Sequence, residues 1–363
     1  MEYVLSELSE QVATARAAKR TLRIRGGGTK AFYGNPWSGD ETAGWLDLAP
    51  YSGVITYEPS ELVLTARSGT PLAEIEALVA GQGQMLAFEP PRFGSGGTLG
   101  GCVAAGLSGP RRMAAGAAAD FVLGTRLLGA DGTVLHFGGE VMKNVAGYDL
   151  SRLLAGSLGI LGAIVEVSLK VVPKPRTEVT TLLELDERQA LDQCLRWRSQ
   201  PLPISATAWI GDGVGRGCLS VRVSGNESAV RQALVRIGGQ TLLEADADAF
   251  WTGLRDQTHA FFRQTPLWRV VLPPKAPALD LGATLHEWGG GLRWLAGPQD
   301  AAALRARAQA LGGSVCLYRR GDVPADVPAF HPLTAGLLHI HQRLKQEFDP
   351  AGIFNPHRLI PEF

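Results

Sequence analysis

Cysteine is scarce in this sequence. The four that occur, Cys102, Cys194, Cys218 and Cys316, lie far apart and form no CxxC pair. This spacing argues against a zinc ribbon, an iron–sulfur centre or a disulfide scaffold, and is typical of a protein from a reducing compartment. The chain also lacks any apolar run of about 18 residues, which argues against a membrane-spanning helix. Residues 1–9 show no apolar stretch of a signal peptide, so we expect a cytoplasmic protein.

Net charge is absent as well. Lys and Arg together number 35, as do Asp and Glu, so no long-range field draws the chain toward nucleic acid or anionic lipid. A length of 363 residues suits two domains. Glycine, in contrast, is abundant at 45 residues and is clustered. Clustered glycine is typical of backbone that turns tightly or approaches a ligand closely.

The first half of the chain predicts a mixture of helices and strands. Leu5, Leu8, Val12 and Ala15 recur at helical spacing, and Asp131-Gly132 predicts a hairpin turn. A second helix is expected after Thr70 as its cap, with Pro71 at its first position. Strands are expected at 21–25, 62–66, 121–128, 134–137 and 165–171, the last of them half-buried. The Pro173-Lys174-Pro175 break is the expected domain boundary.

Beyond that boundary the pattern changes to β-α-β-β-α-β order, which predicts a ferredoxin-like unit. Its expected elements are 178–185, 186–200, 204–209, 218–223, 228–237 and 241–243. A looser second copy is expected over 268–318. From Pro332 the sequence predicts a helix and then a tail, 349–356, that folds back onto the first domain. The expected domains are therefore 1–175, 176–330 and a returning segment, 331–363.

Two glycine clusters carry the chemistry. Arg25–Lys30 contains three consecutive glycines after a strand, whose N–H groups can converge on a phosphate, although a plain tight turn is the alternative. The spacing matches neither a Rossmann fingerprint nor a Walker A loop. Gly94–Gly106 is either a flexible loop or the glycine-rich start of a buried helix, where a helix dipole would favour a phosphate. The pair suits a dinucleotide held along its length.

Further motifs carry a specific resemblance. The runs 138–153 and 156–162, together with 25–29, 98–101, 173–175 and 348–356, resemble the FAD domain of bacterial 2-hydroxy-acid dehydrogenases of the vanillyl-alcohol-oxidase type. The segments 81–86, 109–112 and 288–294 resemble the FAD-binding E subunits of bacterial glycolate oxidases. This resemblance implies an α+β fold: a PCMH-type FAD-binding domain of two α+β subdomains, with a reduced ferredoxin-like cap domain.

The resemblance also implies where FAD binds. A pyrophosphate loop, a flavin-lining segment, an adenine side and a tail residue near the isoalloxazine ring are expected. The implied residues are Arg25, Gly26, Gly27, Gly28, Thr29, Lys30, Thr98, Gly100, Gly101, Ala104, Ala105, Gly106, Ser108, Asp120, Val122, Gly159, Gly162, Ile164, Val165 and Asn355. Thr29 occupies the position at which several relatives attach FAD to a histidine, so non-covalent FAD is expected.

Catalytic residues are harder to assign, because the metal-binding histidine motifs of catalytic relatives have no clear counterpart. His286, Glu287 and Arg293 are the candidates, with an exposed strand pair as the alternative for the first two. Arg293 between Trp288 and Trp294 suits either a carboxylate clamp or a partner-facing patch. Lys143 and Tyr148 are candidates for shaping the site, and Arg111-Arg112 for meeting a partner. His339 and His341 lie two apart on a helix and are not expected to bind metal.

We therefore expect an FAD-binding subunit of a glycolate-oxidising complex that is accessory or electron-transferring. The resemblance implies a D-type flavin subunit and an F-type iron–sulfur subunit as partners, a 2-hydroxy acid as the substrate of the complex, and membrane association only through it. One alternative is a stand-alone FAD-dependent 2-hydroxy-acid dehydrogenase. The other is a structural subunit with a vestigial flavin site.

Overall fold

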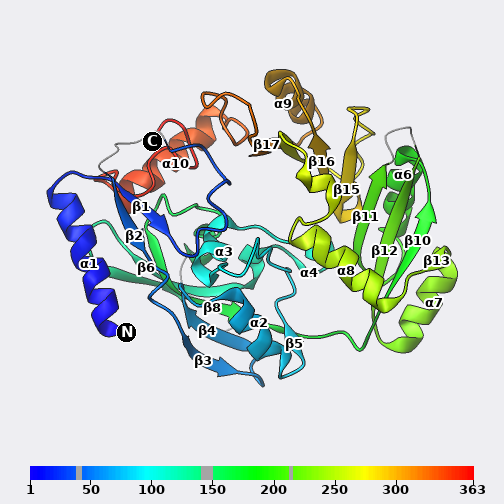
Figure 1. Ribbon diagram of the computed structural model, residues 1–363, viewed down its shortest axis with the longest axis horizontal. Coiled ribbons are helices and arrows are strands. Elements are labelled where there is room, and N and C mark those ends of the chain that lie inside the picture. Colours follow the sequence, from blue (N-terminus) through cyan, green and yellow to red (C-terminus); the bar gives the residue numbers. More distant parts are fainter. Residues whose placement is uncertain (38–42, 140–149, 212–215) are drawn as a thin grey trace. The chain divides into compact units, whose positions relative to one another are not determined.

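The chain folds into two compact units in the computed structural model, which describes residues 1–37, 43–139, 150–211 and 216–363 (Figure 1). Unit 1 comprises Met1–Leu107, Ala117–Pro173 and Pro332–Phe363. Unit 2 comprises Ser108–Gly116 and Lys174–His331. The division after Pro173 lies at the proline-rich break. The assignment of Ser108–Gly116 to unit 2 is a feature that the sequence does not reveal.

Unit 1 joins a small parallel strand pair to a larger antiparallel sheet. β1 (Leu22–Arg25) pairs with β2 (Gly44–Asp47), and a five-stranded sheet has the order β3-β4-β8-β6-β7. Its strands are β3 (Val54–Glu58), β4 (Val63–Arg67), β6 (Val122–Leu128), β7 (Val134–Gly138) and β8 (Ala163–Lys170), and β5 (Gln84–Met85) pairs with β9 (Val172–Pro173). The helices are α1 (Glu2–Ala17), α2 (Leu72–Ala80), α3 (Leu99–Ala105), η1 (Ala118–Phe121), α5 (Leu150–Leu153) and α10 (Ala335–Phe348).

One apolar core ties the parallel pair, the sheet and the C-terminal tail of unit 1 together. It contains Leu8 and Val12 of α1, Leu46 of β2, Val165 of β8 and Phe354 of the tail. β8 is buried on both faces, so its alternating pattern does not mark a half-exposed strand as expected. Its buried Glu166 accepts hydrogen bonds from Tyr51 and Arg126, which explains how a carboxylate is tolerated there.

Unit 2 is an eight-stranded sheet made of two ferredoxin-like halves. The strand order β13-β10-β12-β11-β15-β16-β14-β17 places two four-stranded motifs side by side, joined by antiparallel β11 and β15. The first half is β10 (Thr177–Glu184), α6 (Glu187–Trp197), β11 (Ile204–Gly211), β12 (Gly217–Gly225), α7 (Glu227–Ile237) and β13 (Gln240–Thr241). The second is β14 (Leu267–Val271), β15 (Thr284–Glu287), η3 (Trp288–Gly290), β16 (Leu292–Ala296), α9 (Ala301–Ala310) and β17 (Ser314–Arg319). The remaining helices are α4 (Arg112–Ala115), α8 (Glu244–Arg255) and η2 (Ala260–Arg263).

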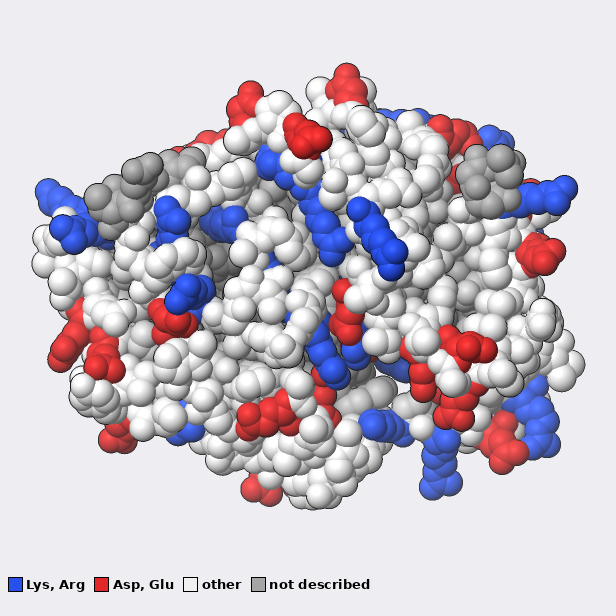
Figure 2. Space-filling view, viewed as in Figure 1, with Lys and Arg blue, Asp and Glu red and all other residues white. Residues whose placement is uncertain are grey.

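The second half lacks the helix that should follow its first strand, because residues 272–283 are irregular. This explains why its sequence pattern is looser. Basic and acidic side chains are interspersed on the face that Figure 2 shows, as the balanced composition predicts. Among the described residues, no helix is both long and apolar enough to cross a bilayer.

Candidate functional site

A cavity of about 550 Å³ lies within unit 1, a volume in the range of small-molecule and cofactor sites. Six segments far apart in the sequence line it: β1 with the glycine loop that follows, β2 with Leu48, Ser68 after β4, α3 with its cap, the loop before β8 with the start of that strand, and the C-terminal tail. The lining residues are Arg23, Ile24, Arg25, Gly26, Gly27, Gly28, Thr29, Lys30, Ala31, Tyr33, Pro36, Trp37, Trp45, Leu48, Ser68, Thr98, Gly100, Gly101, Ala104, Ala105, Leu158, Gly159, Gly162, Ile164, Asn355 and Arg358.

The two glycine clusters meet at this cavity through their backbones. A Cβ on Gly27 would lie 1.4 Å from the carbonyl oxygen of Gly96, and one on Gly26 would lie 2.3 Å from Oγ1 of Thr98. No side chain fits between the loops at these points. The glycines are therefore required for close approach of the two walls, which the tight-turn alternative does not explain.

Helix α3 lines the cavity with its backbone, but its first N–H groups already have hydrogen-bond partners within the protein. Thr98 caps it, accepting a hydrogen bond from N–H of Gly101 at 3.3 Å. The N–H groups of Leu99 and Gly100 donate to carbonyls of Thr70 and Ser68. The first amide groups of α3 are thus occupied within the protein, so the expected helix-dipole contact with a phosphate is not supported by this geometry.

The charge of the cavity suits an anionic ligand. The charged side chains among its described lining residues are Arg23, Arg25, Lys30 and Arg358, with no carboxylate. Arg358 donates to carbonyl oxygens of the loop that follows the glycines, at 2.5 Å to Ala31 and 2.6 Å to Tyr33. Burial lowers the pKa of this guanidinium. Arg358 therefore shapes the loop, while the other cations are placed along the cavity wall.

Polar atoms without protein partners also line the cavity. Nε of Arg23, Nε1 of Trp37 and Oγ of Ser68 are buried and have no hydrogen-bond partner among the described residues. The Arg23 guanidinium lies 4.2 Å from the Trp37 ring centroid and 5.5 Å from that of Trp45. Buried polar groups are normally paired, and these three would be satisfied by a ligand with several acceptors. Together with the glycine walls, they fit a dinucleotide.

The tail residue Asn355 bridges two walls of the cavity. Its Oδ1 accepts a hydrogen bond from N–H of Ile24 at 2.9 Å, and its Nδ2 donates to the carbonyl of Leu158 at 2.7 Å. Gly159 is required beside it, because a Cβ there would lie 2.9 Å from Nδ2. Phe354 also forms a bridge with Leu22. The end of the chain is thus part of the site.

Most of the expected cofactor residues line this cavity, and the exceptions have clear structural roles. Gly106 ends α3 with φ of 62°, and Asp120 accepts a hydrogen bond from N–H of Ala117. Val122 and Val165 are fully buried, and Ser108 belongs to unit 2. Lys143 and Tyr148 fall outside the described residues.

Several lining residues were missed from the sequence. Arg23, Ile24, Trp37, Trp45, Ser68, Leu158 and Arg358 are the principal ones. Arg23 could have been found, because it alternates with Ile24 directly before the glycine loop. The others come from distant segments whose meeting depends on the tertiary fold.

The candidate catalytic residues lie in the interior of unit 2, so an exposed strand pair is wrong. His286 is 2% exposed and Glu287 4% exposed. Nε2 of His286 lies 3.1 Å from Oε1 of Glu187, and Glu287 accepts a hydrogen bond from Nε1 of Trp294. Burial lowers the pKa of His286, an effect that Glu187 only partly offsets. These contacts indicate structural roles.

Arg293 and its tryptophan neighbours do not form a partner-facing patch. Arg293 is fully buried and donates to carbonyl oxygens of Gly290, Ala276 and Pro277. Trp294 is 4% exposed, and Trp288 donates from Nε1 to the carbonyl of Gly109. The prediction failed because tryptophan and arginine, although enriched at interfaces, also occur in protein interiors where their polar groups have hydrogen-bond partners.

Replacing Arg293 by methionine is expected to destabilise the protein by about 3 kcal/mol, because three buried carbonyls lose a charged donor. The change should leave FAD affinity unaltered, since Arg293 lies in unit 2 and the cavity in unit 1. Denaturant unfolding and a flavin titration measure the two effects. An unchanged unfolding midpoint would contradict the assigned role.

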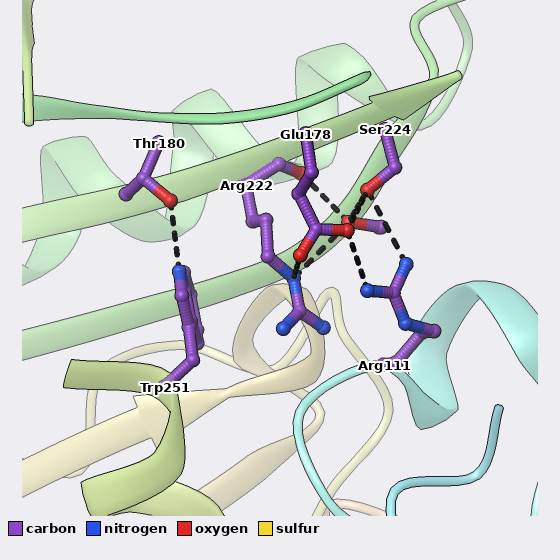
Figure 3. A network of polar contacts seen from close by, with 7 residues as sticks. Arg111, Glu178, Thr180, Arg222, Ser224 and Trp251 are labelled. Carbon is purple, nitrogen blue, oxygen red and sulfur yellow. Dashed lines mark hydrogen bonds and ion pairs between the residues drawn. The ribbon is translucent and has the colours of Figure 1, made fainter. Parts of the chain in front are cut away.

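Arg111 is likewise buried rather than on the surface. It donates to Glu178 at 2.5 Å and to Ser224 at 3.2 Å, and Nε of Arg222 lies 3.7 Å from the same carboxylate (Figure 3). Burial raises the pKa of Glu178, but the two guanidinium groups outweigh this effect and hold that pKa below its usual value. Arg112 stacks on Trp288, 4.3 Å from its ring centroid. This network anchors Ser108–Gly116 within unit 2.

His339 and His341 lie on α10 and belong to no cluster of three or more potential metal ligands among the described residues. His341 contacts the carbonyl of Leu337 through Nδ1 at 2.8 Å. Across the described part of the chain, no group of His, Cys, Asp and Glu side chains is arranged to hold a metal ion.

Comparison with known proteins agrees with the geometry. Residues 5–138 match the family described as FAD binding domain. The glycolate oxidase subunit GlcE of Escherichia coli is 44% identical over 98% of this chain and 97% of its own length. The glycolate oxidase subunit GlcD of Bacillus subtilis is 34% identical over 36% of this chain, which spans 27% of that relative. An alkyldihydroxyacetonephosphate synthase structure shares the fold, with a TM-score of 0.65 at 16% identity, covering 96% of this chain and 74% of that one.

The match over residues 5–138 identifies the FAD-binding family, and the expected α+β flavoprotein fold is confirmed. With near full-length similarity in both directions, the chain belongs to the GlcE family of FAD-binding oxidoreductase subunits.

Proposed function

We propose that this chain is the FAD-binding subunit of a complex that oxidises glycolate to glyoxylate. The observation that carries the proposal is a cavity of matching chemistry in a chain 44% identical to GlcE over nearly its whole length. A bound FAD would supply the two-electron acceptor for such an oxidation. The residues of this chain that would hold it are the two glycine loops, Arg23 and Trp37 as hydrogen-bond donors, and Asn355 at the tail wall.

A D-type flavin subunit and an F-type iron–sulfur subunit are the proposed partners, and peripheral membrane association would come through them. A GlcD relative matches part of this chain, which supports two related flavin subunits descended from one fold. The four cysteines of this chain are scattered, so an iron–sulfur centre would have to reside on another subunit. Co-purification of the chain from its native source, followed by iron and flavin analysis, tests this assembly.

The contacts within the cavity argue against the alternative of a vestigial flavin site. A site that no longer bound a ligand would be expected to lose its glycine contacts and to pair its buried hydrogen-bond donors with acceptors of the protein. Here Gly26 and Gly27 still permit close approach, and Arg23 and Trp37 keep unpartnered donors among the described residues.

The purified protein is expected to carry FAD that acid precipitation releases completely. None of the described residues lining the cavity is a histidine or a cysteine, and Thr29 lines it at the loop position for which the sequence resemblance implies a flavin-linked histidine in several relatives. The absorbance of the supernatant near 450 nm measures the release. A yellow pellet would contradict non-covalent binding, and a colourless protein that cannot be reconstituted would contradict flavin binding itself.

A further inference from the structure

A lysine of α10 is buried beside the cofactor cavity. Lys345 is 7% exposed and Asp349, one turn later, is 2% exposed. Nζ of Lys345 donates to Oδ2 of Asp349 at 2.7 Å, to the carbonyl of Ile160 at 2.7 Å and to the carbonyl of Phe354 at 2.9 Å. An ammonium group has three protons, so each has an acceptor.

Asp349 fixes the turn that follows the helix. Its Oδ1 accepts a hydrogen bond from N–H of Ile353 at 3.1 Å, and its Oδ2 accepts one from N–H of Phe354 at 2.8 Å. The carboxylate therefore holds the lysine and the tail backbone together. Neither residue lines the cavity itself.

The segments that Lys345 joins are the ones that form the tail wall of the cavity. Ile160 follows Leu158 and Gly159, which line the cavity, and Phe354 precedes Asn355, which also lines it. Asn355 in turn binds the backbone of Leu158. Two contacts, one from Nζ of Lys345 and one from Asn355, thus hold the same pair of segments together.

Stability alone does not account for a buried ion pair here. Burial lowers the pKa of Lys345, and Asp349 only partly offsets this effect, so the charged form is disfavoured relative to water. Apolar replacements of such pairs are often neutral or stabilising, whereas a buried pair can define one arrangement of the segments that it joins.

We propose that Lys345 is a positioning residue of the dinucleotide site: paired with Asp349, it holds Phe354–Asn355 against Leu158–Ile160 and so sets the wall that FAD contacts. The proposal rests on the proposed function of the cavity.

The test compares FAD affinity with stability in matched variants of the full chain. In Lys345→Met/Asp349→Asn no charge remains buried, but the amide oxygen can accept only one of the two tail hydrogen bonds and two buried carbonyls lose their donor, so the melting temperature should fall about as far as in Asp349→Asn. The contacts to Ile160 and Phe354 are lost, so FAD should bind the apoprotein about tenfold more weakly, as expected for one or two lost hydrogen bonds. Quenching of FAD fluorescence on titration with apoprotein measures the affinity.

Two further variants separate positioning from general destabilisation. Asp349→Asn keeps the lysine contacts to both carbonyls, so it should lower the melting temperature but leave FAD affinity within about threefold of wild type. Glu178→Gln removes a carboxylate from the buried network of unit 2 (Figure 3) and should lower stability without changing FAD affinity.

Equal FAD affinity in wild type and the double variant would overturn the positioning role. An equal loss in Asp349→Asn or in Glu178→Gln would also overturn it, because affinity would then follow stability. Should the double variant fail to fold, Lys345→Gln, which shortens the side chain and removes its charge, takes its place: wild-type FAD affinity in that variant would overturn the positioning role. A wild-type apoprotein that binds no FAD would instead refute the proposed function.

Discussion

Replacing Gly27 by alanine is expected to abolish FAD binding, lowering affinity at least about 100-fold, in a protein that still folds. The added Cβ would lie 1.4 Å from the carbonyl oxygen of Gly96 and 2.5 Å from its carbonyl carbon. Both are backbone atoms, so the conflict cannot be relieved by a rotamer change, and the two glycine loops must separate. The clash falls on the cavity wall, so the loss is concentrated in binding.

A matched control comes from Gly83, which has φ of 67° and no atom within 4 Å of its added Cβ. Gly83→Ala costs about 1 kcal/mol of backbone strain but should keep full FAD occupancy. The ratio of flavin to protein absorbance, with dissociation constants for the reconstituted apoproteins, measures both variants. Wild-type occupancy in Gly27→Ala would place the cofactor elsewhere.

Short-range sequence patterns predicted several helices, strands and turns correctly. The spacing of Leu8 and Val12 predicts α1, and Asp131-Gly132 predicts the turn between β6 and β7. The strand and helix order after Pro175 predicts the first half of unit 2. The expected N-cap of α2 was wrong. The Thr70 hydroxyl donates to the carbonyl of Arg67 and accepts a hydrogen bond from N–H of Gly53, and α2 begins after Pro71.

Features that depend on distant segments were not predictable in this way. The pairing of α10 with the loop before β8 through Lys345 leaves no local signal, since a lysine on an amphipathic helix is usually solvated. The anchoring of Arg111 to Glu178 joins residues 67 positions apart. Burial of Arg293 depends on carbonyls of an irregular segment, 272–283, whose conformation the sequence does not define.

The same contrast explains the catalytic candidates. Histidine, glutamate and arginine close together in sequence are consistent with an acid–base site or with a packed interior, and whether the fold places them along a cavity separates the two; none of these three lines the cavity of unit 1. His286, Glu287 and Arg293 proved to be buried, with polar partners within unit 2. The cavity residues were more predictable, because glycine clusters have few roles other than close approach.

The isolated chain is expected to reduce its flavin with glycolate at least about 100-fold more slowly than the assembled complex. Oxidation of a hydroxy acid requires a base for the hydroxyl proton, and such a group contributes about 10²- to 10⁴-fold. The three residues proposed for this chemistry are at most 4% exposed, and the described residues hold no cluster suited to a metal. Groups on a partner subunit would then complete the reaction.

Anaerobic stopped-flow mixing of the FAD-loaded chain with glycolate or D-lactate measures this rate through bleaching near 450 nm. Dithionite provides the control, because it should bleach the same flavin rapidly and show that the cofactor is accessible to electrons. Slow bleaching by both acids, with rapid bleaching in the purified complex, is the expected result. Full reduction of the isolated chain within seconds by either acid would contradict an accessory role. The base would then have to be sought among cavity residues and those outside the described ranges, such as Tyr148, rather than at His286.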